Sequence, residues 1–270
     1  MHANDIRSTA AIRHGAYLCL QLSPNVARAL SAIDIPALAS RLDLHDEFNP
    51  PGDHPARAIA YLRRVSATPA ALADDGLLRA DVVIHVAADD AATVDEFRSE
   101  LTRHIGDLDA NALRTLSGVV RPPNYTGTAM HNFAYARRVL QQPGQRMPNA
   151  FLMPLSKVPE WWSKTWLERH TYFLPRYDAE GNMLNEGHAL VAEPGISCLL
   201  RRTYKPEQEP AAAGSYDFIN YFECADADVD VFHAVCAGLR DRQRNPEWRF
   251  VLEGPTWHGR RVATLSEACR

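Results

Sequence analysis

The sequence predicts an α+β fold that is built from two similar halves. Three observations lead to this prediction. Each half contains segments with the composition and alternation of strands, each contains an amphipathic segment long enough for a helix, and the order of these segments recurs. Strand, returning strand, helix and strand together make a ferredoxin-like unit. We therefore expect one ferredoxin-like half in residues 1–125 and a second in residues 126–270.

In the first half, strands are predicted over 16–22 (AYLCLQL) and 81–87 (DVVIHVA). Two short helices are predicted between these strands, at 36–42 and 56–64. A longer helix is predicted over 92–105, because its apolar residues recur at helical spacing and two acidic residues stand in its first turn.

In the second half, strands are predicted over 196–204 (ISCLLRRTY) and 216–223 (YDFINYFE). A helix follows over 229–242, and a short strand follows over 248–252. Clusters of proline, glycine and asparagine separate these segments, as is usual for turns and loops.

The overall composition excludes several classes of protein. The chain has 270 residues with a formal net charge of −4, so nothing in it predicts a nucleic-acid partner. No apolar run is long enough to cross a membrane. The N-terminal residues contain no apolar segment typical of a secretion signal, so we expect a cytoplasmic protein, or a periplasmic one if such a signal has been removed.

The five cysteines do not form a recognisable motif. Their number is odd and no two are spaced as C-x-x-C, which argues against a disulfide framework, a zinc site and covalent haem attachment. We expect free thiols in a reducing compartment, most of them buried as small apolar side chains.

Among eleven scattered histidines, His188 has distinctive neighbours. Any one histidine alone is explained more readily as a structural or surface side chain than as a ligand. His188 follows a glycine and precedes the apolar run 189–192. A neutral imidazole on an apolar face can bind haem iron, but a buried histidine held by a hydrogen bond would have the same pattern.

Two further pairs of neighbouring residues carry possible chemistry. Arg201 and Arg202 are adjacent in a predicted strand, so their side chains point to opposite faces. A buried arginine needs an anion, which is either a carboxylate at the edge of a sheet or a ligand steered to a bound metal. Trp161 and Trp162 either wall a flat cofactor or pack a core or interface.

Several segments together resemble the chlorite dismutase superfamily of haem proteins. They cover about residues 96 to 262, and the ordered set is specific although each match alone is weak. The segments are 116–125 (LSGVVRPPNY), 154–162 (PLSKVPEWW), 200–204 with 216–223, 245–247 (NPE) and 254–259.

The resemblance implies roles for individual residues. His188 lies thirteen positions before Arg201, which is the family's separation between the axial histidine and the distal arginine. Glu247 is the nearest match to the glutamate that accepts a hydrogen bond from the other ring nitrogen of that histidine and so makes it a stronger donor to iron. Tyr125 is implied to meet a haem propionate. Trp161 and Trp162 are implied to lie against the haem or a neighbouring subunit.

The sequence departs from the family's pattern in two places. About a dozen additional residues stand between Trp162 and His188, which leaves His170 as a rival ligand. We favour His188 because its spacing to Arg201 matches the family. The lysine that supports the glutamate in the family is expected to be replaced near Asn149.

The resemblance also implies a fold and an activity. The fold is a dimeric α+β barrel, with two ferredoxin-like repeats in one chain, haem b in the second half, and assembly into a homo-oligomer, most often a pentamer. The substrate is a small anion such as chlorite, which is converted to chloride and dioxygen while cationic Arg201 holds hypochlorite until the O–O bond forms.

Two alternatives stay open from the sequence. One is a different haem-dependent oxidoreductase or biosynthetic enzyme on the same scaffold, either peroxidase-like or coproheme-decarboxylase-like, although the distal arginine counts against a decarboxylase. The other is a barrel protein that binds no haem.

Overall fold

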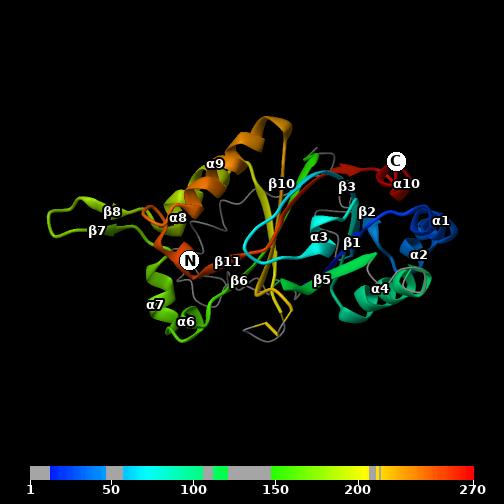
Figure 1. The fold of residues 1–270 in the computed structure, drawn as a ribbon, viewed down its shortest axis with the longest axis horizontal. Coiled ribbons are helices and arrows are strands. Elements are labelled where there is room, and N and C mark those ends of the chain that lie inside the picture. Colours follow the sequence, from blue (N-terminus) through cyan, green and yellow to red (C-terminus); the bar gives the residue numbers. More distant parts are fainter. Residues whose placement is uncertain (1–12, 47–56, 106–111, 121–146, 207–210, 213) are drawn as a thin grey trace, which may run out of the picture.

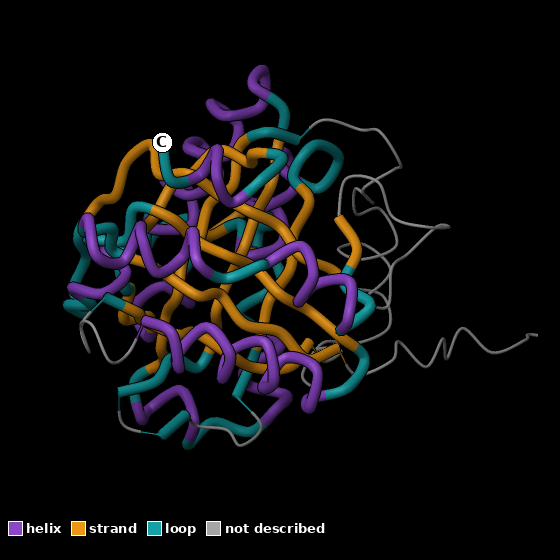
Figure 2. Tube along the Cα trace, turned by 90° about the vertical axis from the view of Figure 1, so that its right-hand side faces the viewer, coloured by secondary structure: helices purple, strands orange, loops and turns teal. Residues whose placement is uncertain are grey.

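The computed structural model describes residues 13–46, 57–105, 112–120, 147–206, 211–212 and 214–270. Its strands form a curved sheet at the centre of the molecule, and the helices lie outside that sheet (Figures 1 and 2). None of the helices in these segments is long and apolar enough to cross a membrane.

The elements of the first half alternate between strands and helices. In chain order they are β1 (Arg13–Leu20), α1 (Pro24–Ala32), α2 (Ile35–Arg41), β2 (His45–Asp46), β3 (Ala58–Thr68), α3 (Asp75–Leu78), β4 (Val82–Ala88), α4 (Ala91–Ile105) and β5 (Leu113–Val120).

The second half follows the same plan with additional short elements. In chain order they are β6 (Asn149–Lys157), α6 (Pro159–Trp162), α7 (Trp166–Thr171), β7 (Arg176–Tyr177), β8 (Met183–Asn185), α8 (Gly187–Ala192), η2 (Glu193–Gly195), β9 (Leu200–Tyr204), β10 (Phe218–Cys224), η3 (Asp226–Asp228), α9 (Val229–Arg240), η4 (Pro246–Phe250), β11 (Val251–Glu253), β12 (Thr256–Val262) and α10 (Leu265–Ala268).

The sheet has the strand order β5-β1-β4-β3-β12-β6-β10-β9. If the four main strands of each half are numbered along the chain, both halves have the order four-one-three-two, which is that of a ferredoxin-like unit. The halves join where β3 pairs with β12. The predicted α+β fold with two ferredoxin-like repeats is therefore confirmed.

The barrel nearly closes at the outer strands β5 and β9. Val119 and Lys205 exchange two backbone hydrogen bonds there, of 2.8 and 2.9 Å. Gly118 allows this approach, because a Cβ atom at that position would collide with the carbonyl group of Lys205.

The interior of the barrel holds a buried aromatic and polar cluster. His85 of β4 stacks on Tyr17 with 4.7 Å between ring centroids, and its Nε2 lies 2.9 Å from the hydroxyl of Tyr204. Glu223 forms a fully buried ion pair with Arg261. Because these residues come from both halves, the two repeats share one interior.

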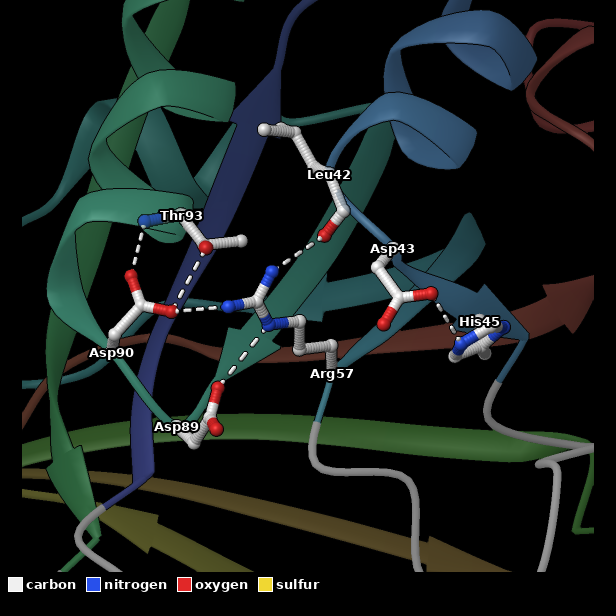
Figure 3. A network of polar contacts seen from close by, with 7 residues as sticks. All are labelled: Leu42, Asp43, His45, Arg57, Asp89, Asp90 and Thr93. Carbon is white, nitrogen blue, oxygen red and sulfur yellow. Dashed lines mark hydrogen bonds and ion pairs between the residues drawn. The ribbon is translucent and has the colours of Figure 1, made fainter.

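An arginine secures the start of α4 (Figure 3). Asp90 caps this helix by accepting a 2.7 Å hydrogen bond from the backbone nitrogen of Thr93. Arg57 donates to Asp90 at 2.8 Å, to Asp89 at 3.2 Å and to the carbonyl oxygen of Leu42 at 3.2 Å. These bonds connect the end of α2 with the start of α4.

The structure corrects three of the predicted elements. Residues 56–64 were expected to be helical, but most of them belong to β3, which is held between β4 and β12. Residues 196–199 form a turn rather than part of β9, since Leu199 donates to the carbonyl oxygen of Gly195. Residues 248–250 continue the short helix η4, and β11 begins only at Val251.

Candidate functional site

The outer face of the second half's sheet, which α8 and α9 cover, is only partly filled with apolar side chains. Its apolar cluster is small, and Phe151 of β6 anchors it by stacking on Phe232 of α9 at 3.7 Å. Polar and charged side chains occupy other positions on the same face. This mixed composition is typical of a binding layer rather than of a closed core.

Lys157 lies on this face at the end of β6. Residues 151, 153, 155 and 157 share one side of the strand, so the side chain of Lys157 continues the row that Phe151 begins. Its Nζ atom donates to Glu247 Oε1 and lies 4.2 Å from the ring centroid of Trp161. The side chains of Lys157 and Glu247 are only 4% and 5% exposed.

His188 completes this chain of contacts. Its Nδ1 atom lies 2.8 Å from Glu247 Oε2, and the carboxylate joins the imidazole to the ammonium group of Lys157. Since an ionised carboxylate only accepts hydrogen bonds, we assign the proton of the neutral ring to Nδ1. That tautomer leaves the lone pair on Nε2, the nitrogen that would bind a metal ion.

The charges in this chain stabilise one another. Burial raises the pKa of Glu247, but the positive charge of Lys157, the charge that His188 carries when protonated, and the hydrogen bonds from both residues outweigh burial and lower that pKa to about 2. Burial lowers the pKa of Lys157, and the Glu247 carboxylate opposes this effect. Glu247 is therefore an anion at every physiological pH, and it is a constant hydrogen-bond acceptor for His188.

The local backbone presents His188 at the start of α8. Gly187 has φ +67°, and a Cβ atom there would collide with the carbonyl oxygen of Leu174, so a glycine is needed. The backbone nitrogen of His188 donates to the carbonyl oxygen of Tyr172 at 3.1 Å. The imidazole of His188 lies 5.0 Å from the ring of Phe173, measured between centroids. The side chain of His188 is 26% exposed, so the ring is accessible.

Arg201 lies on the same face of the sheet as Lys157. It stands opposite Phe222 of β10, whose ring packs against Phe232 of α9 at 5.6 Å. Directly opposed residues share a face, so Arg201 points toward the helix layer. Arg202 points into the barrel, where its Nη1 atom lies 3.5 Å from His85. The two arginines thus point to opposite faces, as the strand pattern predicts.

The two tryptophans have different neighbours. Trp161 is fully buried beneath Lys157 and packs near Phe250, with 5.7 Å between the ring centroids. Trp162 stacks on Phe218 at 6.3 Å, and the guanidinium of Arg169 lies 5.2 Å from its ring. Trp161 therefore supports the Lys157 contact directly. Tyr125 lies outside the described residues.

The structure also bears on the rival ligand and on the expected loss of the lysine. His170 lies in the last turn of α7, whereas the contact with Glu247 is made by His188. The expected replacement of the lysine near Asn149 was wrong, because Lys157 supports Glu247. Asn149 lies at the opposite end of β6 and donates to Asp226 at 3.0 Å. Strand alternation from Phe151 onward could have placed Lys157 on the same side of β6 as Phe151, but not in contact with Glu247.

Comparison with solved structures identifies the fold. Chlorite dismutase from Candidatus Nitrospira defluvii in complex with imidazole is 19% identical, with a TM-score of 0.64 over 95% of this chain and 93% of that one. The chain has the chlorite dismutase fold. A tryptophan-to-phenylalanine variant of the same enzyme in complex with cyanide matches equally well, with 19% identity, a TM-score of 0.64 and coverage of 95% and 93%.

A shorter relative shares this chlorite dismutase fold over less of the chain. A dimeric chlorite dismutase from Nitrobacter winogradskyi is 17% identical, with a TM-score of 0.51 over 75% of this chain and 99% of that one. No protein-family model and no curated protein sequence matches the chain.

The donor set of this chlorite dismutase fold is compatible with haem. An accessible imidazole held at Nδ1 by a buried carboxylate is the arrangement that metal-binding histidines commonly have. On the same face of the sheet, Arg201 is a permanent cation of the kind that attracts anionic ligands, and Phe151 and Phe222 pack against Phe232 of α9. The residues present therefore fit an iron porphyrin ligated by a neutral histidine.

Proposed function

We propose that this protein binds haem b through His188 and converts chlorite to chloride and dioxygen. One observation carries the proposal: His188, Glu247 and Lys157 form a buried chain that orients an accessible imidazole on the face toward which Arg201 points. The fold shared with chlorite dismutases supports it. When bound, haem would supply a redox-active iron, and the protein's side chains would hold that iron and bind the anions.

Each residue of the chain of contacts has a distinct task. His188 would hold the iron through Nε2, because its Nδ1 is engaged by Glu247. Glu247 would increase electron donation from the ring, since a full negative charge polarises the Nδ1–H bond. Lys157 keeps that carboxylate ionised inside the protein, and Trp161 covers the lysine from water.

Arg201 would act on the anions. Chlorite enters as ClO₂⁻ and leaves as Cl⁻ and O₂, so both oxygen atoms of the substrate end in one product. A permanently cationic guanidinium can hold hypochlorite, the anion that arises midway, beside the reaction centre until the second oxygen atom has been transferred. Tyr125 is proposed to bind a haem propionate.

The protein is also proposed to act as a homo-oligomer, most often a pentamer in this fold. A relative of the same fold is described as dimeric. Among the residues that the structure describes, exposed large apolar side chains gather in the segment between α6 and α8 and include Trp166, Leu167, Tyr177 and Leu184. This segment extends from the body of the molecule (Figure 1), and light scattering after size-exclusion chromatography would give the number of subunits.

Haem binding is tested by the Soret band of the purified protein after addition of haem. His188→Ala is expected to abolish the band, whereas His170→Ala, the matched control, is expected to keep it. Loss of the band in His170→Ala alone would reverse the ligand assignment. Absence of the band in the unmodified protein would favour a barrel protein that binds no haem.

The reaction is tested with an oxygen electrode. The haem-loaded protein is expected to release one dioxygen per chlorite. Arg201→Gln is expected to retain haem, release hypochlorite and bleach faster, whereas Arg202→Gln, which alters the barrel interior instead, serves as the control. Haem binding without oxygen release would favour a peroxidase-like or biosynthetic haem enzyme.

A further inference from the structure

A second set of contacts joins the turn that carries His188 to the loop that carries Glu247. The backbone nitrogens of Glu186 and Gly187 both donate to the carbonyl oxygen of Arg244, at 3.0 Å each. The Arg244 guanidinium in return donates twice to the Glu186 carboxylate, from Nε at 2.6 Å and from Nη2 at 2.9 Å. Four hydrogen bonds therefore connect residues 186–187 with a single arginine.

These contacts lie immediately beside the His188–Glu247 hydrogen bond. Glu186 is two residues before His188, and Arg244 is three residues before Glu247. The short link from Arg244 to Glu247 is itself held in place by the buried Asn245. Its backbone nitrogen donates to the carbonyl oxygen of Asp241 at 2.7 Å, and its side-chain amide donates to the carbonyl oxygen of Leu239 at 3.0 Å. Arg244 is therefore joined to Glu247 by a short, ordered link of two residues.

The capping geometry of α8 supports a dedicated role for Glu186. Glu186 occupies the position before the first residue of α8, yet its side chain makes no capping bond to that helix. Its carboxylate is turned to Arg244 instead. A planar guanidinium that meets a carboxylate with two parallel bonds fixes orientation as well as distance.

We propose that Glu186 and Arg244 are positioning residues that align the His188 imidazole on the Glu247 carboxylate and so set the strength of the bond from His188 to iron. The inference rests on the proposed haem-binding function. Neither residue touches the reacting atoms, and both act through the backbone on either side of the His188–Glu247 contact.

Because the Glu186–Arg244 pair is partly exposed, its effect on the alignment of His188 can be measured apart from any effect on the stability of the fold. The side chains of Arg244 and Glu186 are 48% and 29% exposed, so water and salt weaken their mutual attraction. Loss of the pair should therefore leave the fold intact while the two backbone bonds to Arg244 loosen. Alignment errors of a fraction of an ångström are enough to change a hydrogen bond to a ligated histidine.

The first experiment uses the protein without haem. Selective histidine labelling and NMR, with the signal assigned from His188→Gln, report which ring nitrogen of neutral His188 carries the proton. The unmodified protein is expected to hold the Nδ1–H tautomer. Arg244→Gln and Glu186→Gln are each expected to give a mixture of both tautomers, and the double variant is expected to equal either single one, because the two residues act as a unit.

The second experiment uses the protein with haem. Resonance Raman spectroscopy of the ferrous form gives the iron–histidine stretch, which is expected to fall in both variants. Haem affinity is expected to weaken by up to roughly tenfold, the lower end of the range for partners that orient metal ligands. Arg244→Lys is expected to restore part of the shift, since a lysine keeps the charge but lacks the second parallel bond.

Arg240→Gln is the matched control. Arg240 makes a similar two-pronged pair with Glu253, at 2.9 to 3.1 Å and with 41% exposure, but that pair does not bond to the His188 turn. The tautomer of His188 and the frequency of the iron–histidine stretch should both be unchanged in Arg240→Gln. If Arg244→Gln leaves both at the values of the unmodified protein, the positioning role is overturned. If no haem binds, the proposed function fails, and the NMR measurement still decides the positioning role.

Discussion

The two halves of the barrel share one strand order but fill the layer between sheet and helices differently. In the described part of the first half, twenty-one buried apolar residues, most of them between the sheet and α1, α2 and α4, form one continuous cluster that Ala268 of α10 joins, and Phe97 and Leu101 are fully buried. In the second half, the corresponding cluster has six members, and Lys157, Arg201 and His188 lie on the same side of the sheet. One repeat thus has a large apolar core between sheet and helices, while the other keeps charged and polar side chains in the corresponding layer.

This difference shows that two repeats of one fold can have different roles, one in stability and the other in carrying charged groups. A layer filled with apolar side chains contributes stability in proportion to the area it buries. A buried charged group needs a partner of opposite charge or a hydrogen bond. Here Lys157 forms an ion pair with Glu247, and the Glu247 carboxylate also bonds to His188. The first half therefore stabilises the barrel, and the second half is free to carry a site.

The largest effect should come from the apolar layer of the first half. Leu18 of β1 and Met153 of β6 lie on the helix-facing side of the first strand of each half and are 0% and 7% exposed. We expect Leu18→Ala to lower the free energy of unfolding by about 4 kcal/mol and Met153→Ala by about 2 kcal/mol, since the apolar layer of the first half cannot relax around the cavity. Urea denaturation of the protein without haem measures both, and equal losses would show that the two layers are packed alike.

A smaller loss is expected when the charge chain of the second half is broken. Lys157→Met leaves the Glu247 carboxylate buried without its cation, which should cost about 3 kcal/mol. The double variant with Glu247→Leu removes both charges and should recover most of that stability. A double variant as unstable as Lys157→Met alone would mean that packing around the lysine, and not the charge, is what matters.

The same chain should make the second half sensitive to acid. The folded pKa of Glu247, about 2, lies below its ordinary value of 4.5, so its ionisation stabilises the fold fully above that value and less as the pH falls toward 2. By pH 3 roughly 2 kcal/mol of this contribution should be lost. The difference in unfolding free energy between the unmodified protein and Glu247→Gln should therefore shrink between pH 5 and pH 3, and a constant difference would contradict the assignment.

The smallest effect is expected at the surface of the first half. Arg57 connects α2 with the start of α4, but its side chain and that of Asp90 are 31% and 40% exposed (Figure 3). Arg57→Ala should lower the melting temperature less than any change above, and the decrease should diminish at high salt. Scanning calorimetry at two salt concentrations checks this, with Asp89→Asn as the companion variant.

Much of the fold could be predicted from local patterns. The strands near 16–22, 81–87 and 216–223 and the helices near 92–105 and 229–242 occur close to where alternation and helical spacing predict them. The segment 56–64 was mistaken for a helix because its pattern is ambiguous over so few residues. Pairing with β4 on one side and β12 on the other makes it a strand, and β12 is about two hundred residues away along the chain.

The sequence by itself determined the α+β class, the repeated order of elements and the neighbours of His188, because each depends on residues close together in the chain. Only the tertiary structure decided which groups meet: His188 and Glu247 are 59 residues apart, and Lys157 and Glu247 are 90 apart. Their contact depends on how β6, α8 and η4 pack, and on the loss of water that makes an ion pair there worth forming. For that reason Lys157 could be read in the sequence but not recognised as the support of Glu247.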